Sequence, residues 1–459
     1  MSTSASSTAG TAPGGQGEPP AGNPRGRVVF ASLIGTSIEF YDFYIYATAA
    51  SLVFPALFFP NAQDPTTQLL SSFAVFGVAF VARPVGSVLF GHFGDRIGRK
   101  TTLVASLLTM GIATVLIGLI PAASTPGWAF AAPAVLVLCR FAQGLGLGGE
   151  WSGAALLATE NAPQGKRAIY GTFPQLGAPI GFILANTVFI ALSAALTPEQ
   201  FADWGWRIPF LASAILVIVG LWVRLSLLET PAFRRVLEAE AVTKVPVAHV
   251  FRTSWKQIVS GTFIMLATYV LFYLMTTFTL NYGVAPTVPT DGAPAGLGYE
   301  KIDFLWMLII GVVFFGVFTL VSGPLAERFG RRKHLIWVTV AIILFGGSFV
   351  PLFAAGDVGV QTLLILGFTL MGLTFGPMAA VLPELFPSNV RYTGSGVAYN
   401  LSSVLGAAVA PFIAVWLWAE AGSPVLVGVY LSAMAVITLV ALLMTRETRD
   451  VEYDTNVSA

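Results

Sequence analysis

The sequence is poor in charge: Asp, Glu, Lys and Arg make up only 10% of its 459 residues, whereas 55% are hydrophobic. A soluble domain is about 25% charged, because its surface must be solvated by water. This scarcity argues against a soluble globular protein and makes lipid the natural solvent of the chain. The 47 Gly and 35 Phe residues agree with this, since Gly is commoner in membrane helices than in soluble ones.

Cysteine and the motifs of catalysis are also scarce. Cys139 is the single cysteine, so no intrachain disulfide can form. The sequence contains no Walker loop, CxxC pair, HExxH motif or nucleophile elbow. We therefore expect neither an enzyme nor an ATP-driven pump, and no metal or cofactor apart from a coupling proton. The net charge of +1 gives no reason to expect a nucleic-acid partner, and we expect a monomer in the lipid bilayer.

The first 24 residues, MSTSASSTAGTAPGGQGEPPAGNP, are small, polar and rich in Pro and Gly, with no Lys or Arg and no apolar core. This composition predicts a disordered tail and not a signal peptide. The predicted organisation is an N-terminal tail (1–27), a six-helix half (28–228), a cytoplasmic linker (229–256), a second six-helix half (257–444) and a C-terminal tail (445–459).

Twelve segments are long and apolar enough to span a bilayer, which takes about 20 residues per helix. They lie near 28–56, 69–90, 101–121, 130–156, 168–193, 208–228, 257–280, 302–322, 334–354, 360–382, 390–417 and 423–444. The chain has 24 Lys and Arg residues. With Arg224 assigned to the central connection, all of them except Arg83, Arg140, Arg207 and Lys301 fall on one side of the membrane. Because cytoplasmic connections collect basic residues, we predict an all-α integral membrane protein with both termini cytoplasmic.

Two segments match each other at corresponding places in the two halves. GHFGDRIGRK (Gly91–Lys100) follows the second span, and GPLAERFGRR (Gly323–Arg332) follows the eighth. In a second pair, which starts at Glu160 and Glu384, a Pro comes three residues and an Arg seven residues after the Glu. The halves are therefore predicted to be related copies. Such repeats are typical of transporters with a substrate site near the midplane.

The repeated segment is interpreted as a cytoplasmic loop whose glycines make tight turns. Its acid, Asp95 or Glu327, can pair with Arg or cap the N-terminus of a helix from the opposite half. The residues assigned to a cytoplasmic gate are Asp95, Arg96, Arg99, Glu327, Arg328 and Arg391. The alternative is that the loop acts only as a topology anchor.

These segments, together with RFAQGLGLGGE in the fourth span, resemble the major facilitator superfamily. GTSIEFYDFYIYATAA, GGEWSGAALLATE and PQLGAPIG are similar to its metabolite:proton symporter branch. That branch includes transporters of shikimate, alpha-ketoglutarate, other carboxylates, proline and betaine. The resemblance covers residues 28–445 and implies the major facilitator fold, alternating access and proton-coupled uptake.

Charged residues within the spans are expected to have a function or a partner, because each costs about 2.5–3.5 kcal/mol at the bilayer centre. They are Glu39, Asp42, Arg83, Arg140 and Glu150. Glu39 and Asp42 share a helix face near the midplane, where two neighbouring carboxylates repel and one can hold a proton. Histidine is not expected to compete, since His92, His249 and His334 are placed in loops.

Proton coupling is assigned to Asp42, Glu39, Arg140 and Glu150. The alternative for the first two is structural, with one acid held permanently by Arg140. Glu150 is expected to relay the proton or to form a gate salt bridge with Arg83 or Arg96. Arg83, at the inner end of its helix, is expected to pack or gate and not to bind substrate.

Substrate binding is assigned to residues that can line a cavity near these charges. Arg140 and Gln143 share a helix face, and the planar guanidinium of Arg suits a carboxylate. The predicted set is Arg140, Gln143, Tyr46, Gln175, Tyr273 and Asn400. For the aromatic members the alternative is packing or an interfacial belt.

The sequence thus predicts a multi-pass protein of the bacterial plasma (inner) membrane. Its expected function is proton-coupled uptake of a small polar metabolite, an organic acid such as shikimate or a dicarboxylate. A zwitterionic osmolyte symporter is the first alternative. A proton-coupled drug exporter is another, because GAPIG is similar to the Gly/Pro motif of antiporters. A uniporter and a sensor that does not transport are also left open.

Overall fold

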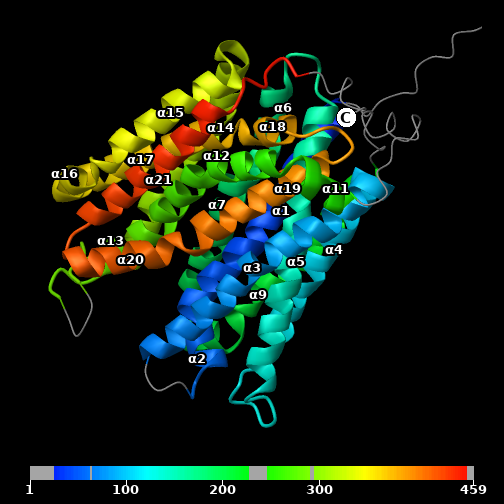
Figure 1. The fold of residues 1–459 in the computed structure, drawn as a ribbon. Helices are drawn as coiled ribbons and strands as arrows, with labels where there is room; N and C mark the ends of the chain where they lie inside the picture. Colours follow the sequence, from blue (N-terminus) through cyan, green and yellow to red (C-terminus); the bar gives the residue numbers. More distant parts are fainter. Residues whose placement is uncertain (1–24, 62–64, 227–245, 290–293, 452–459) are drawn as a thin grey trace, which may run out of the picture.

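The computed structural model describes residues 25–61, 65–226, 246–289 and 294–451, and its regular elements there are all helices (Figure 1). Most of the predicted N-terminal tail, the greater part of the linker and the last eight residues lie outside these ranges.

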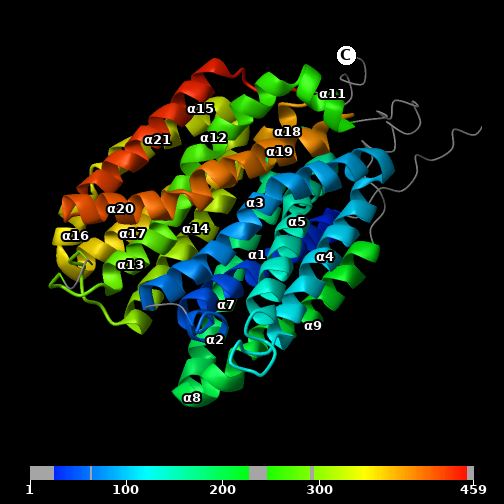
Figure 2. The same ribbon diagram turned by 60° about the horizontal axis from the view of Figure 1, so that its bottom comes forward.

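The first half of the chain forms one bundle. Its long helices are α1 (Arg25–Leu52), α3 (Pro65–Ile97), α4 (Arg99–Leu119), α5 (Ala131–Glu160), α6 (Arg167–Gln175) continued by α7 (Gly177–Ala195), and α9 (Arg207–Leu225). Short connecting elements are α2 (Phe54–Phe58), α8 (Pro198–Gln200) and the π-helical turn η1 (Phe201–Gly205). Figure 2 shows α4 and α9 side by side, on the side of this bundle away from the second half.

The second half forms a matching bundle. Its members are α12 (Trp255–Tyr273) with η2 (Leu274–Phe278) and α13 (Thr279–Val284), α14 (Lys301–Phe329), α15 (Arg331–Gly346) with α16 (Phe349–Ala354), α17 (Gly356–Phe375) with α18 (Met378–Glu384), α19 (Arg391–Ser403) with η3 (Val404–Ala408) and α20 (Ala410–Ala421), and α21 (Val425–Met444). The short α11 (Pro246–Thr253) precedes them. Among the described residues, ten helices are long and apolar enough to cross a membrane. Helix α1 and the pair α15–α16 occupy the remaining two places, as the predicted twelve-helix fold requires.

Glycines let the helices of the first half approach closely. A Cβ added to Gly144 of α5 would lie 2.7 Å from Ala79 Cα of α3, and one added to Gly148 would lie 2.7 Å from Ser87 N. Such distances allow only hydrogen at these positions, so α3 and α5 are in backbone contact. This contact positions Arg83 of α3 next to the charged residues of α5.

The repeated segments are not loops, which corrects the expectation from the sequence. In each of them a single glycine separates two long helices: Gly98 lies between α3 and α4, and Gly330 between α14 and α15. Their φ and ψ angles are 113° and 157° for Gly98 and 93° and 150° for Gly330. This region of backbone space is open essentially to glycine alone. We call the end of the molecule where these two turns lie the basic end, after the Arg and Lys residues around them.

Two further expectations are corrected. His92 and His334 lie in helices α3 and α15, and His249 lies in α11. The His334 side chain is buried, and its Nε2 lies 2.8 Å from the carbonyl oxygen of Leu373. Arg224 does not belong to a connection but to α9, where it is only 3% exposed. The interior of the first half therefore holds one more positive charge than the sequence indicated.

Replacing Gly98 or Gly330 by Ala should destabilise the protein by about 1–3 kcal/mol each, because the side chain must adopt a backbone conformation reserved for glycine. Thermal unfolding of purified variants in detergent measures this. Gly77→Ala is the control, since Gly77 lies within α3 and its added methyl group meets open space. Equal melting temperatures for all three variants would contradict the prediction.

Candidate functional site

At the basic end, the acid of each repeated segment caps a helix of the opposite half. The Asp95 carboxylate accepts hydrogen bonds from Thr393 N (3.0 Å), Thr393 Oγ1 (2.7 Å) and Tyr392 N (3.3 Å), in the first turn of α19. The Glu327 carboxylate accepts one from Ala168 N (2.7 Å), in the first turn of α6. Negative charge at a helix N-terminus is favourable because the free amide groups there carry partial positive charge. The two caps are equivalent under the repeat and join the halves.

The arginines of the predicted gate are divided between the interior and the surface. Arg391 is fully buried, and its Nε donates to the carbonyl oxygens of Pro383 and Phe386 at 3.2 Å. Arg328 and Arg96 are exposed. Arg99 begins α4, directly after the Gly98 turn. A cation that the prediction did not include, Arg331, donates to Glu327 (2.8 Å) and Glu384 (3.3 Å).

The chain that follows α21 covers the same end. Glu447 accepts hydrogen bonds from Arg331 N (2.8 Å) and Arg332 N (3.1 Å) and so caps α15. Thr448 Oγ1 donates to Glu384 at 2.7 Å. Arg167 of the first half donates to the carbonyl oxygen of Val451. This segment therefore bonds to both halves.

Nearer the centre, a second layer of contacts joins α5 and α6 to the second half. The rings of Trp151 and Tyr399 stack with centroids 3.9 Å apart and an interplanar angle of 5°. Asn400 Nδ2 donates to the Gly148 carbonyl at 3.1 Å. Gln175 accepts from Trp151 Nε1 (2.9 Å) and donates to the Phe375 carbonyl (2.7 Å). Gln175 and Asn400, predicted to bind substrate, are engaged here in contacts between the halves.

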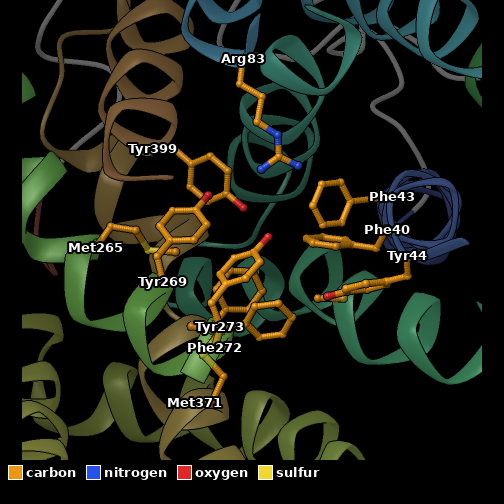
Figure 3. A pocket seen from close by; sticks show the side chains of 12 residues that line it. Phe40, Phe43, Tyr44, Arg83, Met265, Tyr269, Phe272, Tyr273, Met371 and Tyr399 are labelled. Carbon is orange, nitrogen blue, oxygen red and sulfur yellow. The ribbon is translucent and has the colours of Figure 1, made fainter. Parts of the chain in front are cut away.

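A small central cavity, with a volume of about 20 Å³, lies beside this layer, between the two halves (Figure 3). The first half contributes Phe40, Phe43, Tyr44, Arg83 and Ala178 to its wall. The second half contributes Tyr269, Phe272, Tyr273, Phe375, Tyr399 and two methionines. Of the six residues predicted to bind substrate, only Tyr273 is in this wall.

Of the described residues that form the wall of this cavity, Arg83 alone is charged. Figure 3 shows its guanidinium pointing into the space between Tyr399 and Phe43. The guanidinium carbon lies 5.1 Å from the centroid of the Phe43 ring, and Arg83 Nε has no hydrogen-bond partner among the described residues. Arg83 thus packs on aromatic rings, in agreement with one part of the expectation, and it also faces the cavity. The spacing of Arg83 from other charged residues along the sequence did not indicate that it would face the cavity.

Asp42 lies outside the cavity, in the interior of the first half, and is 1% exposed. Its carboxylate accepts hydrogen bonds from Ser213 Oγ (2.5 Å) of α9 and Thr114 Oγ1 (3.0 Å) of α4. Thr114 also accepts one from Gln143 Nε2 (2.8 Å), and Gln143 Oε1 accepts one from Arg140 Nη1 (2.9 Å). The structure thus links Asp42 to Arg140 through two intermediate side chains and not by a direct ion pair.

Both hydroxyl groups that bind Asp42 have a second acceptor within reach. Thr114 Oγ1 lies 3.0 Å from the Met110 carbonyl oxygen, and Ser213 Oγ lies 3.4 Å from that of Pro209. A hydroxyl has one proton to donate and two lone pairs to accept with. When Asp42 is charged, both hydroxyls can donate to it; when it is protonated, one can turn to its backbone acceptor and accept from Asp42. The site can therefore satisfy either protonation state.

Arg140 is completely buried behind the cavity wall. Its guanidinium carbon lies 3.9 Å from the Tyr46 ring centroid, 4.9 Å from that of Phe76 and 5.3 Å from that of Phe43. Within the described residues its Nε and Nη2 have no hydrogen-bond partner. The charge is stabilised by stacking on these aromatic faces and by Gln143.

Glu39 and Glu150 differ in their partners. Glu150 forms a buried ion pair with Arg224 of α9 and accepts a hydrogen bond from Ser106 Oγ at 3.0 Å. The sequence had suggested Arg83 or Arg96 as the partner of Glu150, and this expectation is wrong, because the partner is Arg224. Glu39 is 2% exposed and lies within electrostatic range of Glu150, Arg83 and Arg224. Its Oε2 has no hydrogen-bond partner in the described part of the chain.

The comparisons with known proteins agree with this architecture. Residues 28–455 match the family of sugar (and other) transporters. The chain is 58% identical to the inner membrane metabolite transport protein YhjE of Escherichia coli strain K12, over 93% of its own length and 95% of that protein. It is 36% identical to the shikimate transporter of the same organism, over 92% and 95% of the two chains.

The fold is also that of a solved transporter. The proton:xylose symporter XylE, bound to 6-bromo-6-deoxy-D-glucose, overlays with a TM-score of 0.75 at 16% identity, covering 92% of this chain and 96% of that one. Two six-helix halves around a central cavity define a membrane transporter of the major facilitator superfamily, not an enzyme. The chain belongs to the family of sugar (and other) transporters within that superfamily.

Glu150→Gln should lower the free energy of unfolding by about 3–5 kcal/mol, because it leaves Arg224 as an unpaired buried charge. The double variant Glu150→Gln/Arg224→Met should lose clearly less, since it removes both charges of the pair. Chemical denaturation in detergent compares the two. If the double variant is no more stable than Glu150→Gln, the unpaired charge of Arg224 is not the cause of the lost stability.

Proposed function

We propose that this transporter carries out proton-coupled uptake of a small organic anion through the central cavity, in the bacterial inner membrane and with the basic end in the cytoplasm. The observation that carries the proposal is the position of Arg83. It places one positive charge with a free hydrogen-bond donor inside a cavity that both halves line. A site between repeats is where secondary transporters bind their substrates.

Asp42 is the proton carrier of this proposal. Its two hydroxyl partners have alternative acceptors, so a proton can bind and leave without stranding a buried polar group. Glu150 is less suited, because it is already engaged in an ion pair with Arg224 and a hydrogen bond from Ser106. Glu39 lies within electrostatic range of Arg83 and is the second candidate for the proton carrier.

Alternating access follows from the contacts at the basic end. The two helix caps, the Trp151–Tyr399 stack and the segment after α21 join the halves on that side of the cavity. Release of substrate toward the basic end requires these contacts to break. The proton gradient supplies the free energy for the cycle, and the similarity in fold to the proton:xylose symporter XylE agrees with such coupling.

The proposal is tested by uptake into proteoliposomes with an imposed pH gradient, with labelled shikimate as the first substrate. Uptake should accumulate substrate above equilibrium when the outside is acidic and should fall to equilibrium when a proton ionophore is added. Accumulation that survives the ionophore would overturn proton symport. Accumulation driven outward would favour the exporter alternative.

Asp42→Asn should lose uphill uptake and keep counterflow exchange at a rate within about threefold of wild type, because the neutral amide imitates the protonated acid in shape. Glu39→Gln is the matched comparison on the same helix. If Asp42→Asn accumulates substrate fully while Glu39→Gln does not, the proton carrier is Glu39.

Orientation is tested by labelling introduced cysteines. Arg328→Cys at the basic end and Thr125→Cys in the connection between α4 and α5 are both exposed positions, whereas the native Cys139 is buried. In intact cells, a membrane-impermeant maleimide should modify Thr125→Cys and spare Arg328→Cys until the membrane is opened. The reverse pattern would place the basic end outside.

A further inference from the structure

The central cavity contains charge for one carboxylate. Among the described residues that line it Arg83 alone is charged, and Arg83 Nε has no hydrogen-bond partner there. A guanidinium binds a carboxylate through two parallel hydrogen bonds, which uses the fork that Arg83 presents to the cavity. A second carboxylate on the same substrate would be buried among aromatic rings without a cation, and burying an unpaired charge is costly.

The rest of the wall suits a ring. Phe40 and Tyr44 come from the first half and Tyr269, Phe272 and Tyr273 from the second, so flat faces and edges approach the cavity from both sides (Figure 3). Rings pack on such walls by offset or edge-to-face contact. The hydroxyl group of Tyr44 is buried and lacks a hydrogen-bond partner among the side chains and backbone that the structure describes. It can bind a hydroxyl substituent on such a ring.

A second guanidinium lies one aromatic ring away from the cavity. Arg140 is 0% exposed and is absent from the cavity wall, whereas Phe43 is part of that wall. The Phe43 ring centroid lies 5.1 Å from the guanidinium carbon of Arg83 and 5.3 Å from that of Arg140. Phe43 therefore contacts both charges and covers one of them. Without this ring the cavity would reach a second cation.

We infer, building on the proposed function, that this cavity, widened when the two halves move apart in the transport cycle, binds a ring-bearing monocarboxylate through Arg83, and that Phe43 excludes dicarboxylates by covering Arg140. Phe43 is thus a specificity-determining residue that acts by keeping a buried charge out of reach. The substrate class is set by the number of guanidiniums that the cavity exposes.

The test measures equilibrium binding to the purified, full-length protein in detergent by isothermal titration calorimetry. The ligands are shikimate and cyclohexanecarboxylate as cyclic monocarboxylates, succinate and 2-oxoglutarate as dicarboxylates, and glycine betaine as a zwitterion. We expect the cyclic monocarboxylates to bind at least about tenfold more tightly than the others, and Arg83→Gln to weaken their binding about tenfold or more. Tighter binding of a dicarboxylate or of betaine, or no binding of either cyclic acid, would overturn the inference.

Phe43→Ala tests the role of the covering ring. It should raise dicarboxylate affinity at least about tenfold relative to the cyclic monocarboxylates, and adding Arg140→Gln should remove that gain. Phe272→Ala is the matched control, because Phe272 also lines the cavity but its ring contacts are with Tyr44, Tyr273 and Phe315. An equal gain in Phe272→Ala would mean that added space, not Arg140, changes the preference.

Two features keep the test decisive. Phe43→Leu, a smaller change that keeps an apolar side chain, replaces Phe43→Ala if the latter does not fold, and a smaller gain in the same direction is expected. Binding is measured without a proton gradient, so failure of proton coupling in proteoliposomes would leave this inference standing. Failure of the binding preference would leave the coupling result untouched.

Discussion

A charge inside a bilayer must be enclosed by protein and given a partner, and this constraint governs the arrangement of the first half. Glu150 is joined to Arg224, Asp42 to two hydroxyl groups, and Arg140 to Gln143 and three aromatic rings. These partners come from different helices, so the charges hold α1, α4, α5 and α9 in one register. The glycines of α5 contribute by letting α3 approach until Arg83 reaches the centre.

The buried charges are of two kinds. Glu150 and Arg224 satisfy each other, and any change in their protonation would leave a buried charge unpaired. Asp42, Arg83 and Arg140 instead retain alternatives: a hydroxyl with two acceptors, or a guanidinium nitrogen without a partner among the described residues. A fixed pair stabilises one structure, whereas a group with alternatives can respond to a proton or a ligand. The proposed coupling and substrate recognition both rest on the second kind.

The repeat explains how the halves meet. Asp95 and Glu327 occupy equivalent positions, and each caps the first turn of a helix in the other half. Such contacts are individually modest, on the order of 1 kcal/mol, because the amide groups can also bind water when they are released. Several modest contacts on one side of the cavity can close it firmly and still break within a transport cycle. A single large apolar interface there would be harder to open.

Much of this could be predicted from residues alone. The scarcity of charge, the apolar segments and the matching GHFGDRIGRK and GPLAERFGRR segments predicted twelve helices and a repeated fold, and the fold is confirmed. The same matching predicted that Asp95 and Glu327 pair with Arg or cap helices of the opposite half, and both are found as caps. The glycine turns were placed correctly, although the segments around them are helices and not loops.

The direction in which each buried charge faces could not be predicted. Arg83 and Arg140 both lie in apolar helices, and nothing in their neighbours along the chain tells which of them reaches the cavity. That depends on the rotation of α3 and α5 about their axes, which the close contact at Gly144 and Gly148 sets. For the same reason Arg224 was assigned to a connection and Glu150 to the wrong partner. The sequence by itself determined the helices, their repeat and the supply of charges. Tertiary packing alone decided which charge meets which, because partners separated by up to 298 residues are brought together only when the helices assemble.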